Sequence, residues 1–167
     1  MEMVQMGAGD LDRVSDFLWE CWSEVYLGMA TNGLEGIRAE HRQWLEEGAY
    51  LNSLAEGMLF YMYVQDGKDI GLLGFRAEPF GRLFIDKLYV LNAYRGRGLG
   101  REAMEYALRY GREHGCSTVY LHVNTLNGQA IGFYRRFGLR EISSTRVTHA
   151  GTEYGLTVME GKIQNPT

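Results

Sequence analysis

The chain has 167 residues, of which 46% are hydrophobic and 23% are charged, and its formal net charge is -4. A chain of this length buries roughly 70% of the surface that its unfolded form exposes, so we expect a single folded domain over residues 1–167. The acidic balance argues against a nucleic-acid partner, because phosphate backbones require clustered Lys and Arg.

The cysteines and the apolar runs indicate the compartment. Cys21 and Cys116 lie far apart and in no metal-ligand spacing, so we expect both to be reduced and buried, with no metal site. The first residues lack the basic start and apolar run of a signal peptide. The longest apolar run, residues 58–64, is far shorter than the ~20 residues that span a bilayer. The sequence therefore predicts a cytoplasmic protein that is not membrane-bound.

Apolar residues at three- and four-residue steps predict two helices in the first part of the chain. Asp10 is the expected N-cap of the first helix, whose apolar positions are Leu11, Val14, Leu18, Trp22 and Val25. The second helix carries Ile37, Trp44 and Leu45.

The pattern then changes to that of strands. Residues 58–65 are aromatic and apolar, residues 66–68 read Asp-Gly-Lys and predict a hairpin turn, and residues 69–76 form the returning strand. A third strand is expected over residues 82–91, after the breaker Pro-Phe-Gly at 79–81.

Helical and strand patterns alternate in the rest of the chain. A helix begins at Gly98 and ends at 114–115, and a strand over 117–123 follows. A short helix at 129–137 is then followed by strands near 140–147 and 153–158. With a short N-terminal strand also allowed, the predicted order is two helices, three strands, a helix, a strand, a helix and two strands, which is typical of an α/β domain.

A glycine-rich segment, Arg-Gly-Arg-Gly-Leu-Gly at 95–100, stands where a strand passes into a helix. The unpaired amides of a helix start bind anions, and glycines let them approach a phosphate closely. The dinucleotide fingerprint would need Gly where Arg101 stands, and the Gly-Lys-Ser/Thr of a P-loop is absent. The segment alone leaves open a phosphate site or a structural glycine turn.

Two motifs resemble those of the GCN5-related N-acetyltransferase (GNAT) superfamily. Leu-Tyr-Val at 88–90 precedes the glycine-rich segment, in which Arg95, Gly98 and Gly100 match the family's Arg/Gln-x-x-Gly-x-Gly/Ala. Residues 127–139 resemble its second motif, Asn-x-x-Ala-x-x-Phe-Tyr-x-x-x-Gly-Phe, with Leu139 in place of the final Phe. The two motifs together cover about a third of the chain.

The resemblance implies a mixed, mostly antiparallel central sheet that is splayed in the middle and flanked by helices. It implies acetyl-CoA as co-substrate, no metal, and a homodimer as one assembly. The pantetheine arm would lie on an exposed strand edge by β-augmentation. Asn127 would contact the cofactor, although a turn or helix cap explains it equally well. The remaining implied cofactor-binding residues are Leu88, Tyr89, Val90, Arg95, Gly96, Arg97, Gly98, Leu99, Gly100, Arg101 and Tyr134.

The resemblance also suggests how an acyl group would be transferred. A thioester is already activated, so an amine attacks it directly in a ternary complex, and Tyr134 corresponds to the general acid that protonates the thiolate. Asp86 corresponds to a position where some relatives carry a base or amine-binding carboxylate, and we expect it on one strand face with Phe84, Leu88 and Val90. The alternatives are a core aromatic for Tyr134, an ion pair for Asp86, and His122 as base.

The expected function is N-acetylation of a primary amine, with a small amine or polyamine as the leading acceptor. The alternatives are a non-catalytic acyl-CoA-binding module and a protein N-terminal or lysine acetyltransferase. Aromatic and acidic residues in the first two helices are suited to caging an ammonium, although an amphipathic helix pair with an aromatic core is the favoured explanation. These residues are Trp19, Trp22, Tyr26 and Trp44 with Glu20, Glu24, Glu40, Glu46 and Glu47.

Overall fold

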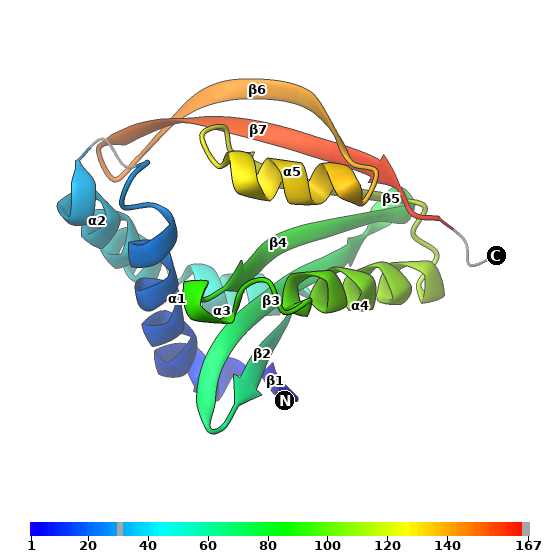
Figure 1. The fold of residues 1–167 in the computed structure, drawn as a ribbon, viewed down its shortest axis with the longest axis horizontal. Coiled ribbons are helices and arrows are strands. Elements are labelled where there is room, and N and C mark those ends of the chain that lie inside the picture. Colours follow the sequence, from blue (N-terminus) through cyan, green and yellow to red (C-terminus); the bar gives the residue numbers. More distant parts are fainter. Residues whose placement is uncertain (30–31, 165–167) are drawn as a thin grey trace.

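A computed structural model describes residues 1–29 and 32–164. Within these residues seven strands form one sheet, and helices cover both of its faces (Figure 1). The strands are β1 (Glu2–Met6), β2 (Leu59–Gln65), β3 (Lys68–Glu78), β4 (Arg82–Val90), β5 (Thr118–Asn124), β6 (Arg140–His149) and β7 (Thr152–Lys162). The helices are α1 (Leu11–Val25), α2 (Gly33–Glu46), α3 (Ala49–Ala55), α4 (Leu99–Glu113) and α5 (Gly128–Arg136).

The sheet has the strand order β1-β2-β3-β4-β5-β7-β6. Every neighbouring pair is antiparallel except β4 and β5, which are parallel. This confirms the predicted α/β class with a mixed, mostly antiparallel sheet. The sequence pattern missed α3, because its seven residues are too few to show a helical period and only Tyr50 among them is buried.

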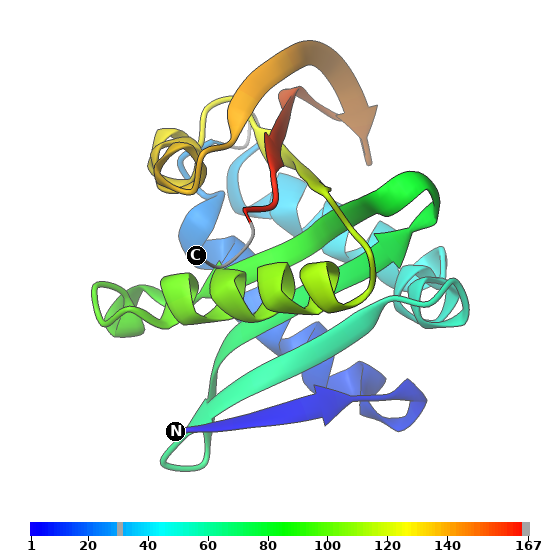
Figure 2. The ribbon, with the colours of Figure 1, turned by 90° about the vertical axis from the view of Figure 1, so that its right-hand side faces the viewer.

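Two apolar cores lie on opposite faces of the sheet. Leu18 of α1 packs with Phe60 and Leu72 of β2 and β3 in one core. Met104 of α4 packs with Leu121 of β5 in the other, which also receives α5. Figure 2 shows the consequence: β6 and β7 form one arm of the molecule, and β1 to β4 form the other.

The apolar face expected for the second helix was wrong at one position. Trp44 is 8% exposed, whereas Leu45 is 42% exposed. Successive helical residues are rotated by about 100° around the axis, so neighbouring positions face different surroundings. Trp44 therefore takes the core-facing position, and Leu45 faces solvent.

The sheet opens between β4 and β5. The two strands pair only along Arg82–Ile85 of β4 and residues 118–121 of β5. Beyond that point β4 continues along β3, whereas β5 stays paired with β7 as far as Asn124. The two strands therefore diverge, as the GNAT resemblance predicted, and α5 packs in the same core as α4.

A β-bulge lies in β4 where this divergence begins. Phe75 pairs with Ile85 and Gly74 pairs with Lys87, so Asp86 is an extra residue without a partner on β3. The bulge interrupts the alternation of faces: Phe84 packs on the core beneath α1, whereas Leu88 packs on the core beneath α4. The expectation that Asp86 shares one face with Phe84, Leu88 and Val90 was therefore wrong.

None of the helices in the described residues is long and apolar enough to cross a membrane.

Candidate active site

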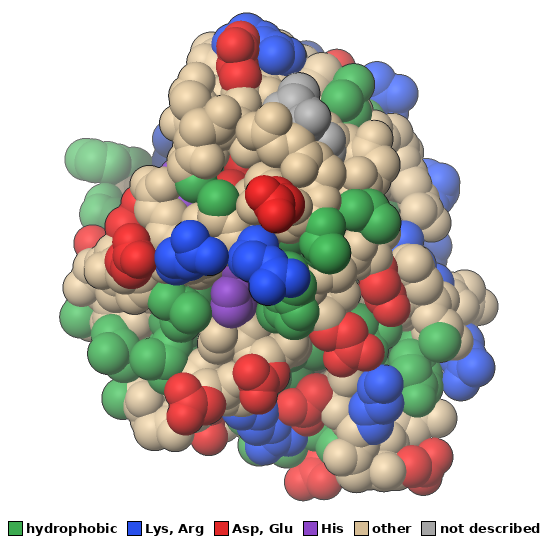
Figure 3. All heavy atoms as spheres, turned by 90° about the vertical axis from the view of Figure 1, so that its left-hand side faces the viewer, with side chains coloured by type: hydrophobic (Ala, Val, Ile, Leu, Met, Phe, Trp, Pro, Cys, Tyr) green, Lys and Arg blue, Asp and Glu red, His purple; other side chains and the backbone are tan. Residues whose placement is uncertain are grey.

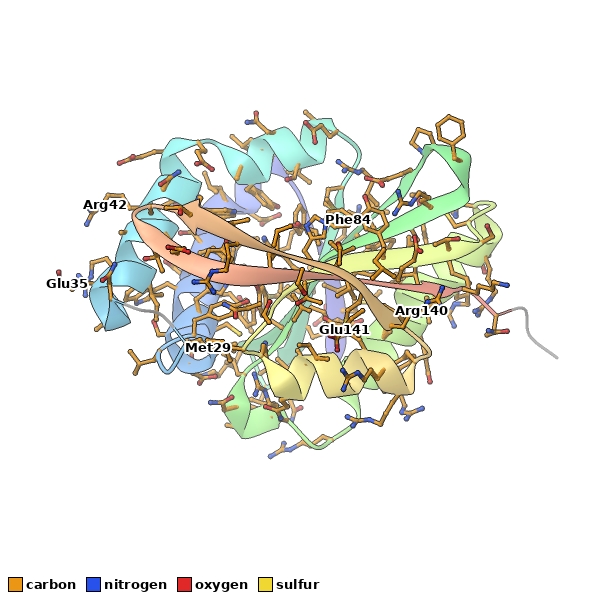
Figure 4. All side chains as sticks on the ribbon, turned by 90° about the horizontal axis from the view of Figure 1, so that it is seen from above. Met29, Glu35, Arg42, Phe84, Arg140 and Glu141 are labelled. Atoms are coloured by element: carbon orange, nitrogen blue, oxygen red, sulfur yellow. The ribbon has the colours of Figure 1, made fainter. Side chains whose placement is uncertain are left out.

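A cavity of about 760 Å³ occupies the gap between the two arms. Its walls are the diverging segments of β4 and β5, the start of α4 and one side of α5, with segments of α1, α2 and β7 at the other end. Figure 4 labels Met29, which lines the cavity and lies beside the start of α5. Residues more than 100 positions apart in sequence thus share one site.

The backbone of β4 presents peptide groups that lack a partner strand to this cavity. The amide of Leu91 donates to the Ile70 carbonyl across a distance of 3.0 Å, which directs that peptide toward β3. Because successive peptide groups of a strand point to alternate sides, those of Leu88 and Val90 point away from β3, where β5 has already diverged. The cavity therefore has an open strand edge as one wall.

The start of α4 presents amide groups to the same cavity. Its first helical hydrogen bond runs from the Glu102 amide to the Gly98 carbonyl at 3.0 Å, which leaves the amides of Leu99, Gly100 and Arg101 without helical acceptors. These amides and the positive end of the helix dipole favour an anion.

The glycines of this segment have different roles. Gly96 and Gly98 have φ values of 77° and 81°, in the left-handed region that favours glycine. Gly100 does not have a positive φ, and a Cβ built there would lie 3.5 Å from the Phe133 ring of α5. Gly96 and Gly98 thus shape the turn, whereas position 100 would accept a Cβ in ordinary contact with Phe133.

The three arginines of this segment do not form a single cluster. Arg95 donates from Nε to the Val90 carbonyl at 3.1 Å and from a terminal nitrogen to Gln129 Oε1 at 3.0 Å. It therefore links the end of β4 to the start of α5. The Arg97 guanidinium lies 5.3 Å from the centre of the Tyr94 ring, and Arg101 lines the cavity with a largely exposed side chain.

Asn127 lines the cavity and caps α5, since its Oδ1 accepts a hydrogen bond from the Ala130 amide at 3.2 Å. The cap fixes the direction of α5 and occupies one of the two polar ends of the Asn127 side chain.

Tyr134 is buried in the middle of α5 and lines the cavity. Burial, with a smaller contribution from the nearby Tyr26, raises the pKa of its phenol well above the ordinary value. The phenol is therefore protonated at neutral pH. The Tyr26 hydroxyl lies 3.0 Å from that of Tyr89 on β4, so three tyrosines from different elements converge on this region.

Asp86 and His122 line the cavity on opposite sides of the gap. The Asp86 carboxylate lies 3.3 Å from Lys87 Nζ, and its side chain is 25% exposed. His122 is exposed on β5, with its ring centre 5.6 Å from that of Phe84. The cavity thus contains both the carboxylate and the imidazole expected as alternative bases.

Only some of the aromatic and acidic residues of the first two helices line the cavity. Trp22, Tyr26 and Trp44 line the cavity, whereas Trp19 does not. Of the five glutamates, Glu40 is the one among the described residues that lines the cavity.

Several cavity residues were missed by the sequence analysis, namely His149, Thr152, Tyr154 and Leu156 from the β6–β7 hairpin and Ile37 from α2. No local motif marks these residues, because only the fold brings the hairpin beside α2.

In residues 1–29 and 32–164 no group of three or more His, Cys, Asp or Glu side chains is arranged to hold a metal ion. Cys21 and Cys116 are both buried and unpaired with each other.

The fold and the cavity define an α/β protein whose sheet opens around a strand edge and a helix start. The family model "Acetyltransferase (GNAT) family" matches residues 11–139, and the chain belongs to that family.

Known proteins with similar sequences carry acetyltransferase names. The chain is 34% identical over 94 residues to streptothricin acetyltransferase of Streptomyces lavendulae, a match that covers 54% of this chain and 50% of that protein. It is 29% identical over 120 residues to peptidyl-lysine N-acetyltransferase YjaB of Escherichia coli, covering 72% of this chain and 74% of that protein. The acceptors in the two names differ.

A solved structure has the same fold. The PaiA N-acetyltransferase from Thermoplasma acidophilum, crystallised in complex with coenzyme A, superposes with a TM-score of 0.76 at 20% identity. The superposition covers 97% of this chain and 99% of that one.

Proposed function

We propose that this chain is a single-domain N-acetyltransferase that transfers an acetyl group from acetyl-CoA to a primary amine. One observation carries the proposal: the peptide groups of Leu88 and Val90, which have no partner strand on the β5 side, the free amides at the start of α4 and the Tyr134 phenol all border one cavity. An extended pantetheine needs a strand edge, and a pyrophosphate needs amide donors. The family membership supports the same cofactor.

The proposed binding residues divide between the two parts of the cofactor. The backbone of Leu88, Tyr89 and Val90 accepts the pantetheine arm as an added strand. The pyrophosphate lies on the amides of residues 96–101, with positive charge from the neighbouring arginines. Asn127 orients α5 through its cap and directs its remaining amide group toward the cavity.

The proposed reaction needs no covalent enzyme intermediate, because acetyl-CoA supplies an activated thioester. The neutral amine nitrogen attacks the carbonyl carbon, the C–N bond forms, and the C–S bond breaks with the electron pair leaving on sulfur. Tyr134 donates a hydrogen bond and then its proton to that sulfur. Asp86, which borders the cavity at the bulge, removes the amine proton or binds the ammonium, and His122 is the alternative base.

The open edge of β4 also bears on the carbonyl group. Because the Leu91 amide points toward β3, the Val90 amide points away from it and is free to donate to the developing oxyanion. A small amine or a polyamine is the leading acceptor because the acceptor end of the cavity combines aromatic walls with carboxylates. We expect the protein to form a homodimer, which light scattering of the purified chain tests directly.

Thiol release from acetyl-CoA tests this function. We expect release with at least one amine of a panel that contains monoamines, polyamines, amino sugars and lysine peptides. If calorimetry shows acetyl-CoA binding but no amine releases thiol, the chain is a non-catalytic acyl-CoA-binding module instead. Release with lysine peptides alone would favour a protein acetyltransferase.

A further inference from the structure

The acceptor end of the cavity contains a carboxylate that the proposed reaction does not use. Glu40 lies on α2, is half-buried and lines the cavity. Within the described part of the chain its carboxylate makes no hydrogen bond and no ion pair. Removing a carboxylate from water is costly unless a positive group or a donor compensates it, so the half-buried Glu40 favours a cationic ligand.

The charged groups near Glu40 have other interaction partners, and His149 also acts on Glu40 itself. Asp86 and Lys87 are 3.3 Å apart and offset each other. His149 Nε2 lies 3.5 Å from Glu47, an ion pair only when the imidazole is protonated. Arg38, on the same helix, has its guanidinium 5.4 Å from the centre of the Trp19 ring, outside the cavity. Burial raises the pKa of Glu40, and the nearby His149 offsets this effect only in part, so this carboxylate favours a further positive group beside it.

The other glutamates of the first two helices differ from Glu40. Glu20 pairs with Lys68, Glu24 accepts from the Asn92 amide, and Glu47 accepts from Gln43. Glu46 is exposed and lies outside the cavity. The favoured sequence explanation, an acidic face outside the site, therefore holds for those four but not for Glu40.

Aromatic side chains surround the space that Glu40 borders. The Trp22 and Trp44 ring centres are 6.2 Å apart in an edge-to-face arrangement, and both rings line the cavity. Glu40 is also close enough to Tyr26 and Tyr154 to disfavour their ionisation. Burial is the main cause that raises the pKa of Tyr26 to about 12 and that of Tyr154 above its ordinary value, and Glu40 adds to both. A carboxylate among aromatic faces is a suitable environment for an alkylammonium.

The surface around this region does not supply a competing charge patch. Figure 3 shows the side of the molecule that carries α1 and α2, where basic and acidic side chains are interspersed. Figure 4 shows that Glu35 and Arg42 of α2 point outward. Selection of a cation therefore depends on the cavity interior.

We propose that Glu40 binds a second, non-reacting ammonium group of the acceptor, so that the acceptor is a diamine or polyamine. This inference rests on the proposed function, since it places the acceptor's reacting amine near Asp86 and Tyr134. Tyr26 connects the two regions, because its hydroxyl lies 3.0 Å from that of Tyr89, between Leu88 and Val90 on β4.

A matched pair of acceptors tests the proposal. 1,4-Diaminobutane and 1-aminopentane have similar lengths, and only the first carries a second ammonium. We expect Glu40→Gln to lower kcat/KM for the diamine about tenfold or more, mainly through KM, and to change that for the monoamine less than twofold. Glu40→Asp should recover part of the preference. Glu35→Gln, the same change at an outward position of α2, should alter neither acceptor.

Equal losses for both acceptors, or no loss for either, would overturn the role of Glu40. If no amine is turned over at all, the proposed function fails separately, and calorimetry still decides this inference. 1,4-Diaminobutane titrated into the CoA-loaded protein should bind more weakly to Glu40→Gln than to the unchanged chain. Equal affinities would contradict the proposal.

Discussion

The phenol oxygens of Tyr26 and Tyr89 lie 3.0 Å apart, which joins the end of α1 to the open segment of β4. Their rings meet edge to face, with centres 6.4 Å apart. Tyr26 follows α1, which helps to form the acceptor end of the cavity. Tyr89 lies in β4, the strand proposed to bind pantetheine. The pair thus connects the two halves of the proposed active site.

Removing one hydroxyl of this pair should destabilise the fold. Tyr26→Phe leaves the Tyr89 hydroxyl without its partner, and we expect the free energy of unfolding in urea to fall by about 1–3 kcal/mol. The double variant with Tyr89→Phe should lose less than the sum of the single losses, because no hydroxyl is then stranded. Strictly additive losses would mean that the two hydroxyls do not interact.

The turn before α4 should need glycine for two separable reasons. Gly98→Ala forces a side chain into the left-handed region at φ 81°, which costs about 1–2 kcal/mol of stability. It should also weaken acetyl-CoA binding, because the amides at the helix start lose their positions. Gly115→Ala is the matched control: its φ is 77° and it lies outside the cavity. Calorimetry should show reduced acetyl-CoA affinity for the first variant alone, while both are destabilised.

Tyr134→Phe should impair the chemical step more than cofactor binding. We expect kcat to fall about 10²- to 10⁴-fold while acetyl-CoA affinity stays within a few fold. Tyr110→Phe, on α4 and outside the cavity, should retain full activity. A Tyr134→Phe variant with unchanged kcat would remove Tyr134 from the reaction.

The pH profile gives an independent check on Tyr134. Burial raises its pKa above the ordinary value, so the phenol keeps its proton through neutral and mildly alkaline pH. A proton donor with a raised pKa is lost only at higher pH, and kcat should therefore show no fall assignable to Tyr134 below about pH 10. An alkaline fall below that pH that disappears in Tyr134→Phe would contradict the assignment.

Glu78 should stabilise the fold at neutral pH and lose this contribution at acid pH. It accepts hydrogen bonds from Tyr120 at 2.5 Å and from Arg76 at 2.6 Å. Burial opposes its charge, but these two partners outweigh burial and lower its pKa. A group with a lowered pKa in the folded protein stabilises the fold at pH values above its unfolded pKa, about 4.3 for Glu. That stabilisation is lost as the pH falls through the pKa of the folded state. Glu78→Gln should therefore cost about 1–3 kcal/mol at pH 7 and much less at pH 3 in urea unfolding.

Local patterns were sufficient for most of the fold. The hairpin after β2 was predicted because Asp66 and Gly67 suit a two-residue turn, and both have positive φ, 51° and 76°. The glycine-rich segment was likewise recognisable, because the backbone geometry of Gly96 and Gly98 depends on the residues themselves. The buried face of β5 followed from simple alternation, with Val119, Leu121 and Val123 buried.

The sequence by itself determined the family resemblance, the order of most elements and the positions of Tyr134 and Asp86 on theirs. Only the tertiary structure revealed the bulge at Asp86, because it depends on the pairing of β4 with β3. It also distinguished Glu40 from the other glutamates of the first two helices. The physical reason is that pairing and burial depend on neighbours distant in sequence: whether a carboxylate is compensated is decided by the elements that fold against it, here α1 and the β6–β7 hairpin.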